Sequence, residues 1–320
     1  MYPAPAESPT KSAINLAMLA ILIVILAFVA TWTGVIRCSV IPGGCNIWWS
    51  VFRSANGGKP LVLIVHGETD DPGLGNPEFL KKSMADPNLL AVRADDVKVE
   101  RVTKDFLKDY DLVIVTKAKI MPTEKMQAFI DYVAEGGRLV WTGDAGTMLD
   151  PSESPGAALL MKSERPGEKD ENVVIGPWAR KDGDYLVALD DFISAEYVDN
   201  YCNVKTCKDV NYSLGYLEAL PGRKHPLVEG IRDDLEFYGD FSIVEPRAGN
   251  NSKRILTLKY GSELITKDKR KLGKEFPIII TSGVGGKVVY YATPLEYFFA
   301  PGRPKKYYQF IEDMYKALLY

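Results

Sequence analysis

Residues 111–146 constrain the fold most, because they hold two short apolar runs separated by one amphipathic helix pattern. The first run, 112–115, is continuously apolar, as expected of a parallel strand covered on both faces. Pro122 suits the first helical turn, and apolar residues then recur at helical spacing: Met126, Phe129, Ile130 and Val133. The glycine pair 136–137 ends the helix, and 139–142 predicts a second buried strand. The stretch therefore predicts one right-handed βαβ unit.

The second strand of this unit runs into Gly-Asp-Ala-Gly, residues 143–146. In open α/β sheets, ligands bind beyond the carboxyl ends of the strands. Thr116 and Lys117 follow the first strand, and Asp144 follows the second. These three side chains are therefore the candidate ligand-binding residues.

Further strand and helix patterns surround the unit on both sides. Before it, 61–65 is a buried strand, Asn76-Pro77 caps a helix, and the valines at 97, 99 and 102 predict an edge strand. The resulting order, β-α-β-α-β-α-β, predicts an α/β fold with a flavodoxin-like, doubly wound, mostly parallel sheet. The last third of the chain returns to strands at 255–260, 276–281 and 288–292, and a final helix begins at Pro304.

Residues 13–36 are almost entirely apolar, and about twenty such residues suffice to cross a bilayer as a helix. A cleaved signal peptide is the alternative, but its apolar region is shorter, about 7 to 15 residues. The length favours an uncleaved, single-pass transmembrane helix, with Trp32, Trp48 and Trp49 as candidate interface residues.

The four cysteines help to orient the chain across the membrane. Cys38 and Cys45 bracket one turn-forming segment, and Cys202 and Cys207 bracket another, so each pair can close a small disulfide loop. Zinc is the alternative, but neither pair has the usual ligand spacing and the chain has 2 histidines. Disulfides form in oxidising compartments, which predicts that the bulk of the chain is extracytoplasmic.

Four segments follow from these patterns. Residues 1–12 are a short cytoplasmic tail, 13–36 the transmembrane helix, 37–59 a juxtamembrane linker with a disulfide loop, and 60–320 one domain. An irregular insertion at about 151–222 interrupts the domain. Asn211 and Asn250 begin glycosylation sequons, which arise often by chance. The net charge is -3 and there is no basic stripe, so nucleic acid is not an expected partner.

The strand and helix at 111–137, followed by Arg138-Leu-Val-Trp, resemble the class I glutamine amidotransferase-like superfamily. His225-Pro-Leu-Val-Glu-Gly-Ile231 and the strand at 286–290 are similar to segments of its ThuA-like and related non-glutaminase branches. The likeness covers roughly 60–320 and is weakest across 151–209. It implies the fold, but fold alone does not give an activity.

The glutaminase machinery of that superfamily is missing. Its nucleophilic cysteine sits on a tight strand-to-helix turn, where this chain has Asp144 or Ala145. The His-Glu pair beyond the last strands is absent as well, because residues 292–297 read Ala-Thr-Pro-Leu-Glu-Tyr. The resemblance therefore implies a domain without glutamine hydrolysis.

Asp144 remains the central candidate for chemistry, as a nucleophile, general base or metal ligand. The more common role for such an aspartate is to cap the turn that follows it. His66 and Glu68, with Asp70 and Asp71 beside them, could bind a divalent ion or do acid-base work if they converged with Asp144. No second histidine lies near, so neither a metal nor a cofactor is predicted.

The remaining candidates have ordinary structural explanations. His225 precedes a proline and is expected to be a structural or rim residue rather than a catalyst. Lys117 and Lys119 can be solvated charges after a strand, and the aromatic segment 290–299 is either core or a platform for a sugar or a partner.

Two functions are compatible with these residues. The first is a non-catalytic pseudoenzyme that serves as an accessory, scaffold or ligand-binding subunit of a membrane or envelope assembly, with a protein partner or a glycan or small-molecule ligand. The second is a hydrolase or other enzyme that acts on a glycan or small polar substrate through Asp144, His66 and Glu68.

Overall fold

The computed structural model of the 320-residue chain describes residues 9–33, 36–40, 42–52, 58–153, 157–161, 174–183, 185–205, 207, 213–220, 225–228, 231, 235–247, 252–266, 269–282, 284, 286–299 and 305–319. Both glycosylation sequon asparagines, Asn211 and Asn250, lie outside these residues, as do Pro304 and much of the expected insertion.

A nine-stranded mixed sheet forms the centre of the domain, in the order β10-β9-β12-β13-β14-β4-β3-β1-β2. Its parallel part consists of β1 (Leu61–His66), β2 (Arg93–Lys98), β3 (Leu112–Val115), β4 (Leu139–Thr142) and β14 (Val288–Tyr291). Its antiparallel part consists of β9 (Gly215–Ala219), β10 (Glu236–Phe237), β12 (Lys253–Ile265) and β13 (Lys271–Thr281). The fold is therefore mixed α/β, with a large central sheet that is parallel on one side and antiparallel on the other.

The predicted parallel core is confirmed strand by strand. All four residues of β3, β4 and β14 are buried, which explains their continuous apolar runs. β2 lies at the edge of the sheet and is largely solvated, but it covers 93–98, whereas the valine alternation placed it later. Val99 instead belongs to a 3-10 turn, η2 (Val99–Arg101). The pairing of β2 with β1, its one neighbour in the sheet, ends at Lys98, so the chain beyond it is no longer held as a strand.

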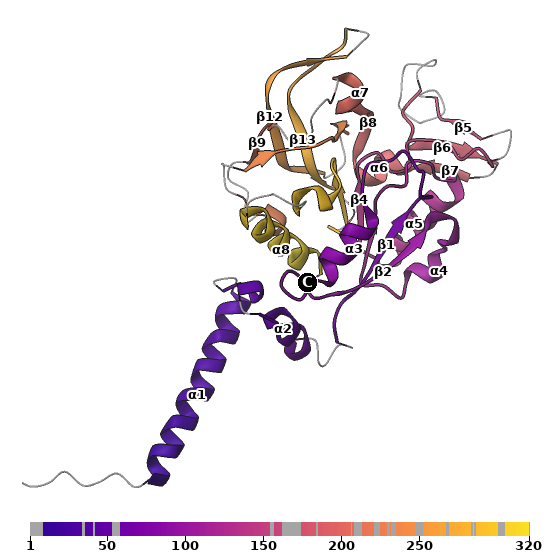
Figure 1. Cartoon of the computed structure of the whole chain (residues 1–320). Helices are drawn as coiled ribbons and strands as arrows, with labels where there is room; N and C mark the ends of the chain where they lie inside the picture. Colours follow the sequence, from indigo (N-terminus) through magenta and orange to yellow (C-terminus); the bar gives the residue numbers. More distant parts are fainter. Residues whose placement is uncertain are drawn as a thin grey trace, which may run out of the picture.

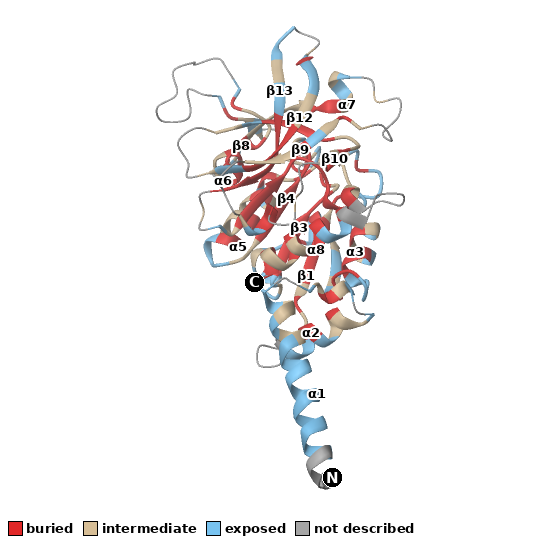
Figure 2. Ribbon diagram, turned by 90° about the vertical axis from the view of Figure 1, so that its left-hand side faces the viewer, coloured by how far each residue is buried: buried red, intermediate tan, exposed pale blue. Residues whose placement is uncertain are grey.

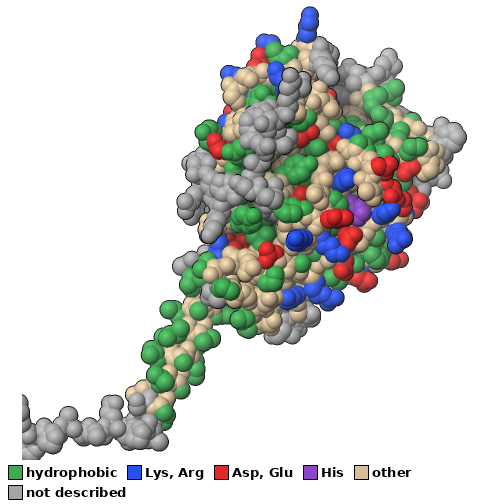
Figure 3. Space-filling view, in the orientation of Figure 1, with side chains coloured by type: hydrophobic (Ala, Val, Ile, Leu, Met, Phe, Trp, Pro, Cys, Tyr) green, Lys and Arg blue, Asp and Glu red, His purple; other side chains and the backbone are tan. Residues whose placement is uncertain are grey.

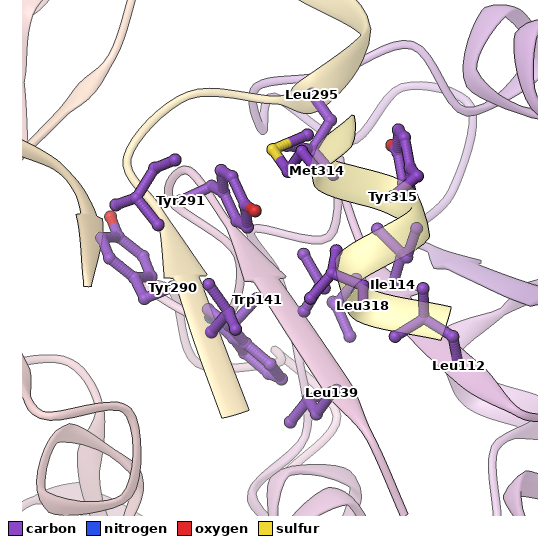
Figure 4. Close-up of a cluster of buried hydrophobic side chains, with 14 of the residues drawn as sticks. Leu112, Ile114, Leu139, Trp141, Tyr290, Tyr291, Leu295, Met314, Tyr315 and Leu318 are labelled. Atoms are coloured by element: carbon purple, nitrogen blue, oxygen red, sulfur yellow. The ribbon is translucent and has the colours of Figure 1, made fainter. Parts of the chain in front are cut away.

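Helices cover both faces of this sheet (Figure 1). α4 (Lys104–Leu107) and α5 (Thr123–Ala134) lie on one face, while α3 (Pro77–Ala85) and α8 (Lys305–Leu319) lie on the other, an arrangement that Figure 2 shows from the side. The Asn76 side chain accepts a hydrogen bond from Phe79 N at 3.0 Å, so the expected cap of α3 is present. Figure 4 shows the buried cluster where β3, β4 and β14 meet α8.

The region after β4 builds two small additional sheets. β5 (Ala158–Leu159), β6 (Ala179–Asp182) and β7 (Tyr185–Ala188) form one, and β8 (Ala195–Asn200) pairs with β11 (Ser242–Pro246) in the other. The short helices α6 (Leu189–Ile193) and α7 (Tyr201–Val204) flank β8. This region brings β8 next to the carboxyl ends of the parallel strands, which positions the site described below.

α1 (Pro9–Trp32) projects from the domain (Figure 1) and carries hydrophobic side chains along its length, whereas charged side chains are interspersed with others over the visible face of the domain (Figure 3). Its segment Ala13–Trp32 is long and apolar enough to cross a membrane, with a mean hydropathy of 2.9, and none of it is buried against the protein. Such a helix fits either a membrane span or a signal peptide.

Both predicted disulfides are present, Cys38–Cys45 and Cys202–Cys207. The first joins η1 (Cys38–Val40) to α2 (Gly44–Phe52) and belongs to the hydrophobic core of the domain. Bonded in this way, these cysteines are unsuited to the zinc alternative, which requires thiolates.

α2 packs on the domain rather than standing apart from it. Trp49 is 1% exposed and its indole N–H donates to the Leu90 carbonyl at 2.7 Å. Trp48 is also buried, and its ring lies 5.2 Å from that of Phe28 in α1. The stretch expected as a linker, 37–59, therefore contains two short helices that contribute to the domain core.

Replacing Trp49 tests whether α2 is part of the cooperative unit. Trp49→Ala removes a buried ring and its hydrogen bond, so we expect the free energy of unfolding to fall by about 3 to 5 kcal/mol. Ile47→Ala is the matched control on the same helix, where Ile47 is 65% exposed, and it should change stability by less than about 0.5 kcal/mol. Urea unfolding of the full chain in detergent measures the free energy of unfolding of both variants. If Trp49→Ala lowers it as little as Ile47→Ala does, α2 is peripheral to the cooperative unit.

Candidate site at the carboxyl ends of the parallel strands

The turn after β4, residues 143–146, is bonded to the surrounding protein along its whole length. Gly143 N donates to the Tyr291 carbonyl and Gly146 N to the Ala118 carbonyl, both at 2.7 Å. The carbonyl oxygens of the turn are used as well: Gly143 O accepts from Tyr290, Ala145 O from the indoles of Trp141 and Trp178, and Gly146 O from Arg180. A turn held in this way is a rigid structural junction.

Asp144 is fully buried within this turn, and its carboxylate is bound by two neutral hydrogen-bond donors and one cation from different parts of the chain. Oδ1 accepts a hydrogen bond from Leu74 N at 2.8 Å, and Oδ2 accepts one from Asn200 Nδ2 at 2.8 Å. The ammonium of Lys119 forms an ion pair with Oδ2 at 3.0 Å. The expectation that Asp144 caps its own turn is therefore wrong, because its side chain points to the neighbouring loop and to β8.

Asn200 extends this network into the β8–β11 pair. Its Oδ1 accepts hydrogen bonds from the hydroxyls of Tyr197 and Ser242, both at 3.0 Å. Burial, followed by the charge of Asp144, raises the pKa of Tyr197, so this phenol stays protonated and donates. The amide thus has a fixed orientation, with its NH2 group directed at Asp144.

The loop that receives Asp144 lies between β1 and α3, and its four consecutive N–H groups at 73–76 all bind side-chain oxygens. Gly73 N donates to Asp71, Leu74 N to Asp144, Gly75 N to the Tyr297 hydroxyl and Asn76 N to Glu296. Consecutive backbone N–H groups form a concave anion-binding arrangement in many proteins. Here three carboxylates and one phenol hydroxyl of the protein itself already accept from those donors.

Glu296, in the 3-10 turn η5 (Leu295–Phe299), is the most perturbed acid of this group. Its side chain is buried and its Oε1 also accepts from Thr116 Oγ1 at 3.2 Å, while Oε2 makes no hydrogen bond to any described residue. Burial raises its pKa to about 7, against the opposing effect of the Asn76 N–H. Gly75 is needed here, since its φ is +135° and a Cβ would lie 2.3 Å from Thr116 Oγ1.

Two further polar groups lie near Asp144. Burial raises the pKa of Asp240 to about 6, although the N–H groups of Cys202 and Phe241 lower it. Burial and the charge of Glu296 raise the pKa of Tyr297 to about 12. The cluster therefore holds more acid than base, with Lys119 as the cation paired with Asp144.

His66 and Glu68 do not join Asp144 in a common site. His66 Nδ1 donates to the Gly67 carbonyl at 2.7 Å and its Nε2 lies 3.6 Å from Asp96, while Glu68 pairs with Lys98. Both partners belong to the edge strand β2, and within the part of the chain that the structure describes neither residue bonds to Asp144. Asp71 instead holds its own loop, accepting from the N–H groups of Gly73, Lys119 and Ile120.

The candidate ligand-binding residues have internal partners. Thr116 is buried and donates to Glu296, and Lys117 donates to the Thr69 carbonyl at 2.9 Å from a left-handed backbone with φ of +46°. Lys119 is not the solvated charge expected from its position, because its side chain is 17% exposed and paired with Asp144. Thr116, Lys117 and Asp144 therefore each join separate parts of the protein, and their role in ligand binding stays a prediction.

His225 lies at the opposite end of the parallel strands from Asp144, in a cavity with residues from the start of β14 and the end of β13. It is therefore not a rim residue of the Asp144 crevice. The aromatic segment 290–299 is core, as its more common role predicted: Tyr290 and Tyr291 are fully buried and Phe298 nearly so.

The described residues offer no cysteine or carboxylate cluster suited to a metal ion. The groupings close enough to share an ion are Cys38, Cys45 with Glu312, and Cys202, Cys207 with Asp240. Each contains a disulfide, whose sulfurs are not thiolate ligands.

Solved structures of similar shape exist for this fold. A ThuA-like protein from Bacteroides uniformis superposes with a TM-score of 0.50 at 15% identity, covering 81% of this chain and 90% of that one. The similarity establishes the fold. Two β-galactosidases, from Rahnella sp. R3 and Bacillus circulans, match with TM-scores of 0.45 and 0.44 at 14% and 12% identity, covering 80% of this chain and 30% of theirs. No family model and no curated protein sequence matches the chain.

Sequence reasoning missed the residues that complete this network: Lys119, Asn200 and Glu296. Glu296 had a detectable signal, because it is the sole charged residue of the aromatic segment 290–299. A carboxylate in such a segment must be neutralised by bonding or by a raised pKa.

Removing one side of the Asp144–Lys119 pair should destabilise the domain. Asp144→Ala leaves the ammonium and the donors of Leu74 and Asn200 without their acceptor, so we expect a loss of about 3 kcal/mol in the free energy of unfolding. Combining it with Lys119→Met should recover part of this loss, by at least about 1 kcal/mol in a double-mutant cycle. Additive effects of the two changes in urea unfolding would contradict the pairing.

The raised pKa of Glu296 predicts a pH dependence of stability. Because the folded pKa of about 7 exceeds the ordinary value of 4.5, its contribution is complete below about pH 4.5 and is lost as pH rises through about 7. The difference corresponds to about 3 kcal/mol at most. Glu296→Gln mimics the protonated acid, so its unfolding free energy should fall less than that of the wild type between about pH 5 and pH 8. Glu100→Gln, at an exposed carboxylate, is the control and should leave the wild-type slope unchanged.

Proposed function

We propose that this chain is a single-pass, membrane-anchored protein whose extracytoplasmic domain has the glutamine amidotransferase-like fold of the ThuA-like branch. We propose further that it works without catalysis, as an accessory, scaffold or ligand-binding subunit of a membrane or envelope assembly. The observation that carries the non-catalytic part is the state of Asp144, at the position of the superfamily's nucleophile: it is buried and bonded to Leu74, Asn200 and Lys119.

A catalytic nucleophile needs an exposed atom near donors that are available to a developing negative charge. Ala145, the other residue that can occupy the nucleophile position, is 1% exposed and has no reactive group. The N–H groups at 73–76 bind internal oxygens, so they serve the fold rather than a substrate. These features support a turn that has the tight geometry of the superfamily's nucleophile turn but no nucleophile and no available N–H donors.

The strand order supports the finer fold assignment. Across its parallel part the sheet runs β2-β1-β3-β4-β14, which is the 2-1-3-4-5 order of flavodoxin-like folds. The antiparallel strands β13, β12, β9 and β10 extend this arrangement beyond β14.

The exposed apolar surface of α1 supports the anchor. A soluble protein rarely leaves such a surface in water, and α1 has none of its spanning segment buried. The two disulfides support an extracytoplasmic domain, since such bonds persist in oxidising compartments.

An enzyme that uses Asp144, His66 and Glu68 together receives less support. His66 and Glu68 pair with β2, whereas Asp144 is bonded to Lys119 and β8. Acid-base partners must lie within hydrogen-bond reach of one substrate, and these side chains are engaged with different elements.

Co-purification with matched variants tests this proposal. The tagged full chain is cross-linked in membranes and extracted in detergent, and bound proteins and the intact mass of the chain are measured by mass spectrometry. We expect α1 to be retained and a near-stoichiometric partner to be recovered with both the wild type and Asp144→Asn. The double variant Ile21→Arg with Val24→Arg should no longer insert into the membrane, because each central arginine costs about 2.5 to 3.5 kcal/mol on insertion. It should therefore also fail to recover the partner.

Ile21→Leu with Val24→Leu is the control for the helix and should behave as the wild type. A mature chain that lacks α1 would identify a signal peptide and overturn the anchor. Recovery of no partner, combined with loss of biological activity in an Asp144→Asn chain that still folds, would overturn the non-catalytic role.

A further inference from the structure

A second feature lies at the opposite end of the parallel strands from Asp144, where β4 and β14 begin. An open cavity of about 580 Å³ is formed there by residues from six parts of the chain. Its lining consists of Gly136, Arg138, His225, Pro226, Leu227, Lys253, Thr281, Ser282, Gly286, Lys287, Val289, Ala317 and Leu318.

The charge of this cavity is one-sided. Arg138, Lys253 and Lys287 contribute three cations, and none of the described lining residues is acidic. Elsewhere on the described surface cations commonly pair with carboxylates, as Lys259 does with Glu218 and Glu275. The ammonium groups of Lys253 and Lys287 form no ion pair with a described residue, and placing them in one hollow is unfavourable without an anion between them.

The polar groups of the cavity can donate hydrogen bonds. Arg138 uses Nη1 to bind the Leu318 carbonyl at 3.0 Å, which fixes the guanidinium against the last turn of α8. Ser282 Oγ accepts from Val284 N at 3.1 Å, so its hydroxyl proton is directed elsewhere. His225 Nδ1 accepts from Leu227 N at 3.3 Å, which assigns the proton of the neutral ring to Nε2, also a donor.

We propose that this cavity binds a phosphate-bearing anion. Lysine ammonium groups act as point charges for phosphate, and arginine binds it through several N–H groups. A phosphate carries enough charge and acceptor oxygens to pair with both ammonium groups while it also contacts the guanidinium and neighbouring hydroxyls. The apolar side chains of Leu227, Val289 and Leu318 line the same hollow and suit the carbon skeleton that bears the phosphate.

Two sources can supply this group, a soluble phosphate compound or the headgroup of an anionic phospholipid. The cavity includes the last turn of α8, which ends on the side of the domain that faces α1 and α2 (Figures 1 and 2). Arg37, shortly after α1, pairs with Asp313 of the same helix at 2.9 Å. The lipid source rests on the proposed membrane anchor, whereas phosphate binding itself does not.

Chemical labelling of lysines in the full chain tests the site directly. Amine-reactive labelling is quantified by mass spectrometry in detergent, with and without inorganic phosphate, and in nanodiscs of phosphatidylcholine with or without phosphatidylglycerol. We expect phosphate to slow labelling of Lys253 and Lys287 while the lysines at 82 and 274, exposed and outside the cavity, react unchanged.

Calorimetric titration with inorganic phosphate supplies the matched variants. Lys253→Gln and Lys287→Gln should each weaken binding by about tenfold, since each removes one charged hydrogen-bond donor. Lys253→Gln combined with Lys287→Gln should weaken binding further. Lys82→Gln combined with Lys274→Gln removes the same total charge outside the cavity and should bind as the wild type.

The outcomes separate the sources. Protection by phosphatidylglycerol but not by phosphatidylcholine identifies a lipid headgroup, and protection by inorganic phosphate alone identifies a soluble ligand. If neither slows labelling of Lys253 and Lys287, or if the cavity and control variants bind phosphate equally, the proposal is overturned. A chain that binds phosphate in detergent but has lost α1 in its mature form would overturn the anchor and leave the phosphate site standing.

Discussion

The bonding of four consecutive N–H groups at 73–76 determines how the parts of this domain meet. Their acceptors come from the loop itself, from the turn after β4 and from η5, so one short loop joins segments that are up to 222 residues apart. Asp144 carries the connection further, through Asn200, to β8 and β11. Because the acceptors Asp71, Asp144 and Glu296 are buried, each must keep its partners, and the loop, the turn and β8 have little freedom to move separately.

The same bonding limits the catalysis that is possible at the carboxyl ends of the parallel strands. A loop of backbone donors beside a tight turn is the arrangement that stabilises negative charge in many enzymes. In this chain the side chains of Asp71, Asp144 and Glu296 already accept from these donors. Burial raises the pKa of Glu296 to about 7, so this site disfavours even the charge of its own carboxylate. An incoming anion would have to displace a carboxylate that is covalently part of the protein, which favours a structural use of the loop.

Local patterns in the sequence were sufficient for the buried parallel strands, the helices between them and both disulfides, since each depends on residues close together in the chain. The solvated edge strand β2 has no apolar run, and its position was therefore predicted too late in the sequence. The network around Asp144 was not predictable in this way. Asn200 lies 56 residues from Asp144, and Glu296 lies 180 from Thr116, so nothing local marks them as partners. The aromatic residues of α2 were ambiguous for another reason: an apolar face suits a lipid surface and a protein core equally, and the indole bond from Trp49 to Leu90 decides for the core.

The short connection after α1 has a consequence for how the domain sits. Four residues, 33–36, separate Trp32 at the end of α1 from Arg37, which is paired with Asp313 in α8. A fully extended chain of this length spans at most roughly 18 Å. In the proposed orientation the domain is therefore held at a nearly constant height above the bilayer, within reach of lipid headgroups and of the extracytoplasmic parts of other membrane proteins.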